Sequence, residues 1–182
     1  MCIRDRRISG LLGGADVLAT KDALIALGAE IEKTASGDWQ VAGVGLHGMI
    51  SPATPLDLGN SGTGVRLLMG VVAGQNVTAT FVGDASLSSR PMARITTPLA
   101  AIGASIASRG GQLPVTITGT PTPMARQQQS TVASAQIKSA ILLAGLNARG
   151  ITEIIEPRAS RDHSESMPVS YTHLTLPTIL LV

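Results

Sequence analysis

Apolar residues recur at helical spacing near the start of the chain, and a glycine follows where the pattern stops. From Asp16 to Leu27 the sequence is rich in Ala and Leu, with one apolar side, and Gly28 is placed to end a helix. Residues 29–33 and 39–44 then alternate in polarity on either side of a turn at 36–38. The pattern predicts a helix followed by a β-hairpin.

The same arrangement returns further along the chain. Leu27-Gly28-Ala29 and Ile102-Gly103-Ala104 are 75 residues apart, and alternating segments at 105–108 and 114–118 follow the second copy around a turn at 109–111. Between the copies, the sequence predicts a turn and helix over 59–73 and a strand over 77–82. A third copy is expected to begin with a helix at 135–148 and a strand at 152–155. Repetition at this length is typical of a duplicated α/β unit.

Composition places the chain among globular proteins and argues against some partners. Hydrophobic residues make up 44% of its 182 positions and charged residues 14%, so a sizeable core can form. Aromatic residues are only 2%, which argues against nucleic acid, and no apolar run reaches the about 20 residues of a membrane span. The single cysteine fits a reducing cytoplasm. Eleven of the fourteen basic residues are arginines, which suits recognition of carboxylate or phosphate.

A glycine-rich turn before the helix at 59–73 is the first candidate site. Gly59-Asn60-Ser61-Gly62-Thr63 stands where a helix start leaves about four unpaired backbone N–H groups and about half a positive charge. Glycine lets a ligand approach that backbone closely, so the turn can hold an anion. The spacing is neither that of a P-loop nor that of a dinucleotide-binding turn, and an ordinary tight turn into a buried helix is the alternative.

Three further motifs follow this turn, at 83–92, 134–140 and 156–163. In this order and at these spacings, the four motifs resemble those of the enolpyruvyl transferases of the shikimate pathway, over about residues 7–167. The resemblance implies an α/β fold of repeated βαβαββ units, an incomplete inside-out α/β barrel with helices inside and sheets outside. It also implies that the chain is part of the N-terminal half of a longer, monomeric enzyme.

The resemblance implies a reaction as well. The enzyme would transfer the enolpyruvyl group of phosphoenolpyruvate to the 5-hydroxyl of shikimate 3-phosphate and release phosphate, with no metal or organic cofactor. Its catalytic base is expected in the missing half, so no catalytic residue is assigned here and the fragment alone is expected to be inactive. Two alternatives stay open: a UDP-N-acetylglucosamine 1-carboxyvinyltransferase, which shares the fold, and a non-catalytic scaffold of repeated units.

The resemblance assigns ligands to individual residues. Gly62, Arg90 and Gln136 are expected to bind phosphoenolpyruvate. Ser134, Ala135, Gln136 and Arg161 are expected to bind shikimate 3-phosphate. Inhibitor-tolerant members of the family carry Ala where this chain has Gly62, so we expect sensitivity to glyphosate, which occupies the phosphoenolpyruvate site.

Each of these assignments has a structural alternative. Thr63 or Ser134 could simply cap a helix, and Arg90 could be a solvated surface residue, with Pro91 as the first residue of the next helix. Arg161 could form a salt bridge with a neighbouring acidic residue. Lys138 is expected to serve the fold rather than the chemistry.

The two ends of the chain do not fit the resemblance. Residues 1–6 and 168–182 look like translated adapter sequence, and we expect them to be a non-native leader and tail around residues 7–167. For the tail, the alternative is a natural edge strand.

Overall fold

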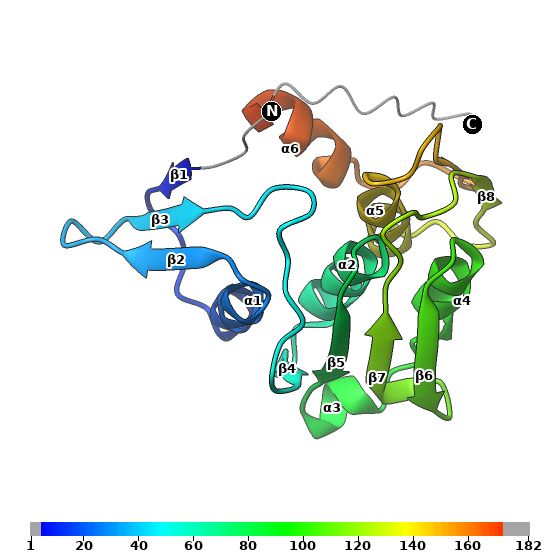
Figure 1. Ribbon diagram of the computed structural model, residues 1–182, viewed down its shortest axis with the longest axis horizontal. Helices are drawn as coiled ribbons and strands as arrows, with labels where there is room; N and C mark the ends of the chain where they lie inside the picture. Colours follow the sequence, from blue (N-terminus) through cyan, green and yellow to red (C-terminus); the bar gives the residue numbers. More distant parts are fainter. Residues whose placement is uncertain (1–4, 173–182) are drawn as a thin grey trace.

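A computed structural model describes residues 5–172 of the chain. Its centre is one complete βαβαββ unit (Figure 1). The unit comprises β4 (Leu56–Asp57), α2 (Gly62–Ala73), β5 (Thr78–Val82), α4 (Ala93–Ala101), β6 (Ser105–Arg109) and β7 (Gln112–Thr118), with the short helix α3 (Ala85–Ser88) before α4. The sheet order is β4-β5-β7-β6, in which β4 and β5 are parallel and the other pairs are antiparallel.

Half a unit lies on each side of this complete one. Before it come β1 (Asp5–Ile8), α1 (Ala15–Ala26), β2 (Glu30–Lys33) and β3 (Trp39–Ala42), with the antiparallel order β1-β3-β2 that matches β5-β7-β6. After it come β8 (Gln127–Gln129), α5 (Ala135–Gly145) and β9 (Glu153–Ile155), in which β8 and β9 are parallel as β4 and β5 are. Helix α6 (His163–Thr172) follows. The predicted α/β fold of repeated βαβαββ units, as an incomplete domain, is confirmed.

The ends of α1 and α4 show the repeat in atomic detail. Gly28 has φ 105° and Gly103 has φ 111°, a region that favours glycine because it has no Cβ. In α1, the next residue, Ala29, donates its N–H to the carbonyl of Leu24 at 3.0 Å. In α4, Ala104 donates to Leu99 at 3.4 Å. Both helices therefore end in the same Schellman motif, 75 residues apart as the sequence predicts.

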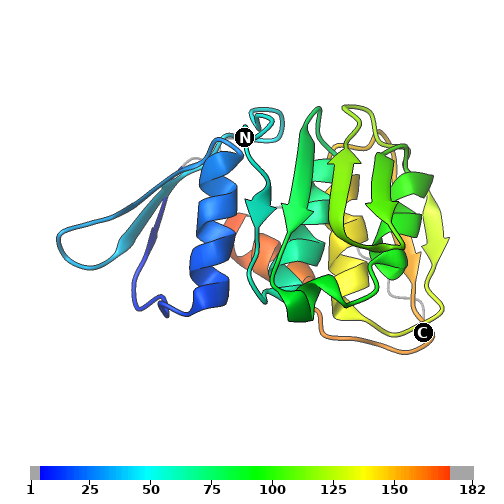
Figure 2. The ribbon, with the colours of Figure 1, turned by 90° about the horizontal axis from the view of Figure 1, so that it is seen from below.

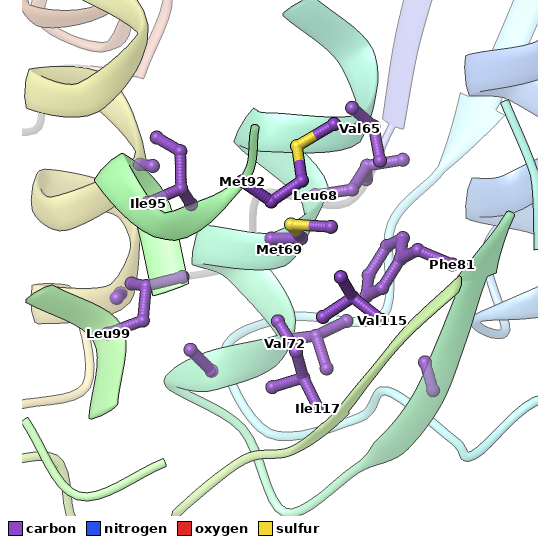
Figure 3. Packing of buried hydrophobic residues seen from close by; sticks show 14 of the residues in the cluster. Val65, Leu68, Met69, Val72, Phe81, Met92, Ile95, Leu99, Val115 and Ile117 are labelled. Carbon is purple, nitrogen blue, oxygen red and sulfur yellow. The ribbon is translucent and has the colours of Figure 1, made fainter. Parts of the chain in front are cut away.

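Helix α2 is the centre of the hydrophobic core (Figure 3). Its apolar side packs against the inner face of the central sheet and against α4 and the segment before it. Figure 2 shows the sheet as one layer and α2 and α5 behind it. Strand β7 alternates buried and more exposed residues along its length, so one face of the sheet covers the core and the other faces outward. Helices inside and sheets outside is the arrangement that the sequence predicts. The labelled core residues in Figure 3 are Val65, Leu68, Met69, Val72, Phe81, Met92, Ile95, Leu99, Val115 and Ile117.

Helices α2 and α5 approach each other through small residues. A Cβ added at Gly70 would lie 2.3 Å from the carbonyl oxygen of Ala140, and one added at Gly74 would lie 2.4 Å from that of Ala144. Gly70 and Gly74 are four residues apart, and so are Ala140 and Ala144, so the contacts lie along one face of each helix. This close approach brings the starts of the two helices near each other.

The structure differs from the sequence predictions in several places. Helix α4 begins at Ala93, because the segment after Asp84 first forms α3, so Pro91 is not the first helical residue. Helix α5 ends at Gly145 rather than at residue 148, and the side chain of Asn147 donates to the carbonyl of Gly74 at 2.7 Å instead. Strand β8 has no apolar alternation, so no sequence pattern predicts it.

The expected leader and tail lie partly outside the described residues, which exclude 1–4 and 173–182. Strand β1 includes Asp5 and Arg6, and α6 continues past the expected boundary at residue 167. The boundaries at 6 and 167 stay predictions. Within the described part of the chain, no helix combines the length and hydropathy needed to cross a membrane.

Candidate functional site

The start of α2 is shaped by a glycine-rich turn that is held by side-chain hydrogen bonds. Gly59 has φ 53°, and its N–H is held by the carboxylate of Asp57 at 2.9 Å. Ser61 is the N-cap: its Oγ accepts from the N–H of Gly64 at 3.3 Å. Gly62 is the first helical residue. The alternative that Thr63 caps this helix is therefore wrong, because Ser61 fills that role.

Two arginine side chains converge on Gly62. A Cβ built on Gly62 would lie 2.6 Å from Nη1 of Arg90 and 3.0 Å from Nη1 of Arg66. Arg66 Nη1 also donates to the carbonyl oxygen of Gly62 at 2.8 Å. Burial, and then the nearby charge of Arg90, lower the pKa of Arg66. Neither arginine forms an ion pair with a carboxylate of residues 5–172. Two guanidinium groups at a helix start, neither of them in an ion pair with a described carboxylate, are an arrangement suited to an anion.

Sequence reasoning assigned Arg90 to this site and missed Arg66. Arg66 stands four residues after Gly62, so on a helix the two lie on the same face, and that spacing was the available signal. It was weak, because exposed arginines on helices are common and the second cation, Arg90, is brought in only by the tertiary fold.

A hydrogen-bonded relay orients Arg90. Its Nη2 donates to Oδ1 of Asn60 at 2.5 Å, and Nδ2 of Asn60 donates to Oδ2 of Asp84 at 2.8 Å. Oδ1 of Asp84 accepts from the N–H of Leu87 at 2.7 Å and so caps α3. The Leu87 N–H first, and then the Asn60 amide, hold the pKa of Asp84 below its usual value. Asn60 therefore links an ionised carboxylate to the arginine.

The start of α5 lies beside the start of α2. Nε2 of Gln136 donates to Oγ1 of Thr63 at 2.7 Å, which joins the two helix starts directly. Ser134 is the N-cap residue by position, with φ −149° and ψ 109°, but its hydroxyl makes no capping hydrogen bond. The alternative that Ser134 serves only as a side-chain cap is therefore wrong.

A cleft of about 220 Å³ opens between these helices and the start of α6. Ala135, Gln136 and Arg161 line it, together with Thr63. Arg161 is exposed and forms no ion pair with any described residue, so the salt bridge considered as its alternative is absent from that part of the chain. Ser134 does not line the cleft itself. The structure thus brings Gly62, Arg90, Gln136 and Arg161 to one region at the starts of α2, α5 and α6.

Lys138 lies behind this region in a buried ionic network. Its side chain is 1% exposed, and its Nζ lies 2.7 Å from Oε1 of Glu165 and 3.4 Å from Oε2 of Glu156. The contact with Glu165 is an ion pair whose alignment falls short of a hydrogen bond. Lys138 is therefore a structural residue of the core, as the sequence suggests. Across residues 5–172, no three His, Cys, Asp or Glu side chains gather as a possible metal site.

Repeated βαβαββ units, with cationic helix starts at one end, define a class of α/β domain suited to anionic ligands. The sequence model of the EPSP synthase (3-phosphoshikimate 1-carboxyvinyltransferase) family matches residues 4–168. The chain therefore belongs to the EPSP synthase family.

Individual relatives agree with this assignment. The 3-phosphoshikimate 1-carboxyvinyltransferase of Parvibaculum lavamentivorans is 54% identical over 168 residues, which cover 92% of this chain and 37% of that protein. The protein of the same name from Zymomonas mobilis is 52% identical over 172 residues, 94% of this chain and 38% of its own length. The EPSP synthase structure from Acinetobacter baumannii superposes with a TM-score of 0.88 at 44% identity, over 94% of this chain and 39% of that one. The chain thus spans somewhat over a third of the length of the relatives it matches.

Proposed function

We propose that the whole protein transfers the enolpyruvyl group of phosphoenolpyruvate to the 5-hydroxyl of shikimate 3-phosphate and releases phosphate. The observation that carries this proposal is the pair of arginines, Arg66 and Arg90, that converge on Gly62 without an ion pair to a described carboxylate. The hydrogen bond between Gln136 and Thr63 joins this helix start to that of α5. The names of the relatives support the substrates, because those proteins are 3-phosphoshikimate 1-carboxyvinyltransferases.

In this proposal the two substrates occupy neighbouring positions. Phosphoenolpyruvate carries a phosphate and a carboxylate, and it binds the N–H groups beside Gly62 and the guanidinium of Arg90, with Arg66 adding a second positive charge. Shikimate 3-phosphate binds at the start of α5, with Arg161 on its phosphate and the backbone of Ser134 and Ala135 on its ring substituents. Gln136 lies between the two, because its amide already reaches Thr63, the neighbour of Gly62. Holding both reactants in one geometry lowers the barrier to transfer.

The groups that move protons are proposed to lie outside this chain, which spans only 37–39% of its relatives. Two described carboxylates near the site are already engaged: Asp84 with Asn60, and Glu156 with Ser134 and Ser160. The chain alone is therefore expected to show no turnover. We further propose that the whole enzyme acts as a cytoplasmic monomer without a metal or organic cofactor.

The two alternative functions find less support. A UDP-N-acetylglucosamine 1-carboxyvinyltransferase shares the fold, but the relatives from Parvibaculum, Zymomonas and Acinetobacter carry the name of the shikimate enzyme. A non-catalytic scaffold gives no reason for two arginines to face each other with no ion pair to a described carboxylate, an arrangement that an anion would stabilise.

The test uses a hybrid enzyme, in which residues 4–168 of this chain replace the matched segment of the Acinetobacter baumannii EPSP synthase. Phosphate release from phosphoenolpyruvate is measured with shikimate 3-phosphate and, separately, with UDP-N-acetylglucosamine as acceptor. We expect turnover with the first acceptor alone. A hybrid that has the circular dichroism and melting curve of a folded enzyme but binds neither phosphoenolpyruvate nor shikimate 3-phosphate would refute the proposed function.

A further inference from the structure

Glu156 is a buried carboxylate that joins two parts of the chain. It follows β9 directly and is 6% exposed. Its Oε1 accepts from the backbone N–H of Ser134 at 2.9 Å, and its Oε2 accepts from the hydroxyl of Ser160 at 2.7 Å. Ser134 is the residue before α5, and Ser160 is the residue before Arg161. One side chain therefore holds both segments that are expected to bind shikimate 3-phosphate.

The carboxylate of Glu156 is kept ionised in this buried place. Burial raises its pKa, but the hydrogen bonds from Ser160 and from the N–H of Ser134, together with Lys138, outweigh burial and bring the pKa below its usual value. An ionised carboxylate accepts stronger hydrogen bonds than a neutral acid, and both of its oxygens are engaged here. Both bonds therefore fix the position of their donors more firmly than neutral bonds would.

The complete unit contains a counterpart of this arrangement. There, Asp84 follows β5, holds Asn60 just before α2, and precedes Arg90 by six residues. Here, Glu156 follows β9, holds Ser134 just before α5, and precedes Arg161 by five residues. In the complete unit, the carboxylate positions its arginine through Asn60. The repeat thus gives independent support for a positioning role at Glu156.

We propose that Glu156 is a positioning residue for the shikimate 3-phosphate site: it sets the distance and orientation between the start of α5 and Arg161 without touching the ligand. This inference rests on the proposed function. Glu156 is not among the residues that line the cleft beside Arg161, so its effect on a ligand passes through Ser134 and Ser160.

Glu165 offers a matched control. It is the other carboxylate on Lys138, it is 8% exposed, and it hydrogen-bonds neither to Ser134 nor to Ser160. Replacing either Glu156 or Glu165 by Gln leaves Lys138 with one carboxylate, so both variants have the same change in buried charge. They differ in whether the bonds to the two binding segments are weakened.

The experiment compares Glu156→Gln, Glu165→Gln and Ser160→Ala in the hybrid enzyme. The dissociation constant of shikimate 3-phosphate is measured by calorimetry, and the KM of phosphoenolpyruvate is measured at saturating shikimate 3-phosphate. For Glu156→Gln we expect about a tenfold weaker affinity for shikimate 3-phosphate, the size of one lost charge-assisted hydrogen bond, with the KM of phosphoenolpyruvate within about twofold. Ser160→Ala removes only a hydroxyl and should also weaken the affinity for shikimate 3-phosphate. If Glu156→Gln fails to fold, Ser160→Ala takes its place in the test.

Glu165→Gln should lower the melting temperature while leaving the affinity for shikimate 3-phosphate within about twofold of the parent. Equal affinities in Glu156→Gln and Glu165→Gln, or parallel losses for both substrates, would overturn the positioning role. A parent hybrid that is folded but binds no shikimate 3-phosphate would instead refute the proposed function, and the inference with it. The two failures are therefore distinguishable.

Discussion

A methyl group added at Gly62 tests how Arg90 serves the anion site. The Cβ of an alanine there would lie 2.6 Å from Nη1 of Arg90 and 3.0 Å from Nη1 of Arg66. Since favourable contacts between heavy atoms begin at about 3.5 Å, the guanidinium of Arg90 must move by about 1 Å. The backbone is not strained, because Gly62 lies in a regular helix where alanine is favoured over glycine by about 1 kcal/mol. The substitution should therefore leave the fold intact and displace the arginine.

Displacing Arg90 disturbs its bond to Asn60 and its proposed contact with a bound anion. A hydrogen bond to a charged group contributes about 1.5–3 kcal/mol, which corresponds to roughly a tenfold to hundredfold loss of affinity. In the hybrid enzyme, Gly62→Ala should raise the KM of phosphoenolpyruvate by about tenfold, and the inhibition constant of glyphosate by at least as much. The KM of phosphoenolpyruvate is expected to rise because the methyl displaces the residue proposed to bind the substrate.

A double-mutant comparison decides whether the methyl acts through Arg90. If it does, Gly62→Ala combined with Arg90→Ala should be no worse for phosphoenolpyruvate than Arg90→Ala alone. The assay is steady-state phosphate release, with phosphoenolpyruvate varied at saturating shikimate 3-phosphate. Additive losses in the double variant would show that the methyl acts on the ligand directly, and the reasoning from Arg90 would be refuted.

Three further outcomes follow from the structure. Gly70→Ala should lower the free energy of unfolding by about 1–3 kcal/mol, the usual cost of overpacking, because its Cβ would lie 2.3 Å from a backbone oxygen. Urea denaturation measures this loss, and Gly13→Ala, whose Cβ meets open space, is the control. Arg90→Ala should raise mainly the KM of phosphoenolpyruvate, and Arg161→Ala mainly that of shikimate 3-phosphate, each by about tenfold or more; kinetics with each substrate varied separately would reveal reversed roles. The lowered pKa of Asp84 means that its contribution to stability is present above the ordinary carboxyl pKa and is lost as the pH falls through the lowered value. Asp84→Asn should therefore flatten the loss of stability below about pH 4, and an unchanged pH profile of unfolding would contradict this.

Much of the fold could be predicted because its signals are local. Gly28 and Gly103 end equivalent helices through the same backbone geometry. That geometry has a positive φ, which favours glycine, so the glycine in the sequence already indicates the helix end. Strand β8 could not be predicted, because Gln127–Gln129 carries no apolar alternation and becomes a strand through its parallel pairing with β9. The start of α4 was predicted too early for a similar reason. The side chain of Asp84 caps the extra helix α3, and α4 begins only at Ala93.

The candidate site also combines residues that local sequence patterns reveal with residues that only tertiary contacts bring together. Gly62 and Gln136 stand at helix starts that the sequence pattern reveals, whereas the pairing of Arg66 with Arg90 depends on contacts between residues 24 positions apart. The bond from Ser134 to Glu156 also spans 22 positions, and no helical or strand periodicity relates the two. Resemblance to a family assigned ligands to residues at the helix starts and to Arg161, and it gave no reason to consider the buried carboxylate of Glu156.

The internal repeat gives a structural reason for the proposal that two anionic substrates lie side by side. Helices α2 and α5 are counterparts in successive units, and each start carries about half a positive charge from the helix dipole. Each is held by a carboxylate that follows the next strand, Asp84 for the first and Glu156 for the second, and each carboxylate is followed by an arginine. The two units differ in what faces the carboxylate: Asp84 is exposed and reaches Arg90 through Asn60, whereas Glu156 is buried against Lys138. The same order of helix start, strand, carboxylate and arginine therefore recurs with different surroundings, and a loss at one carboxylate should leave the affinity at the other proposed site largely unchanged.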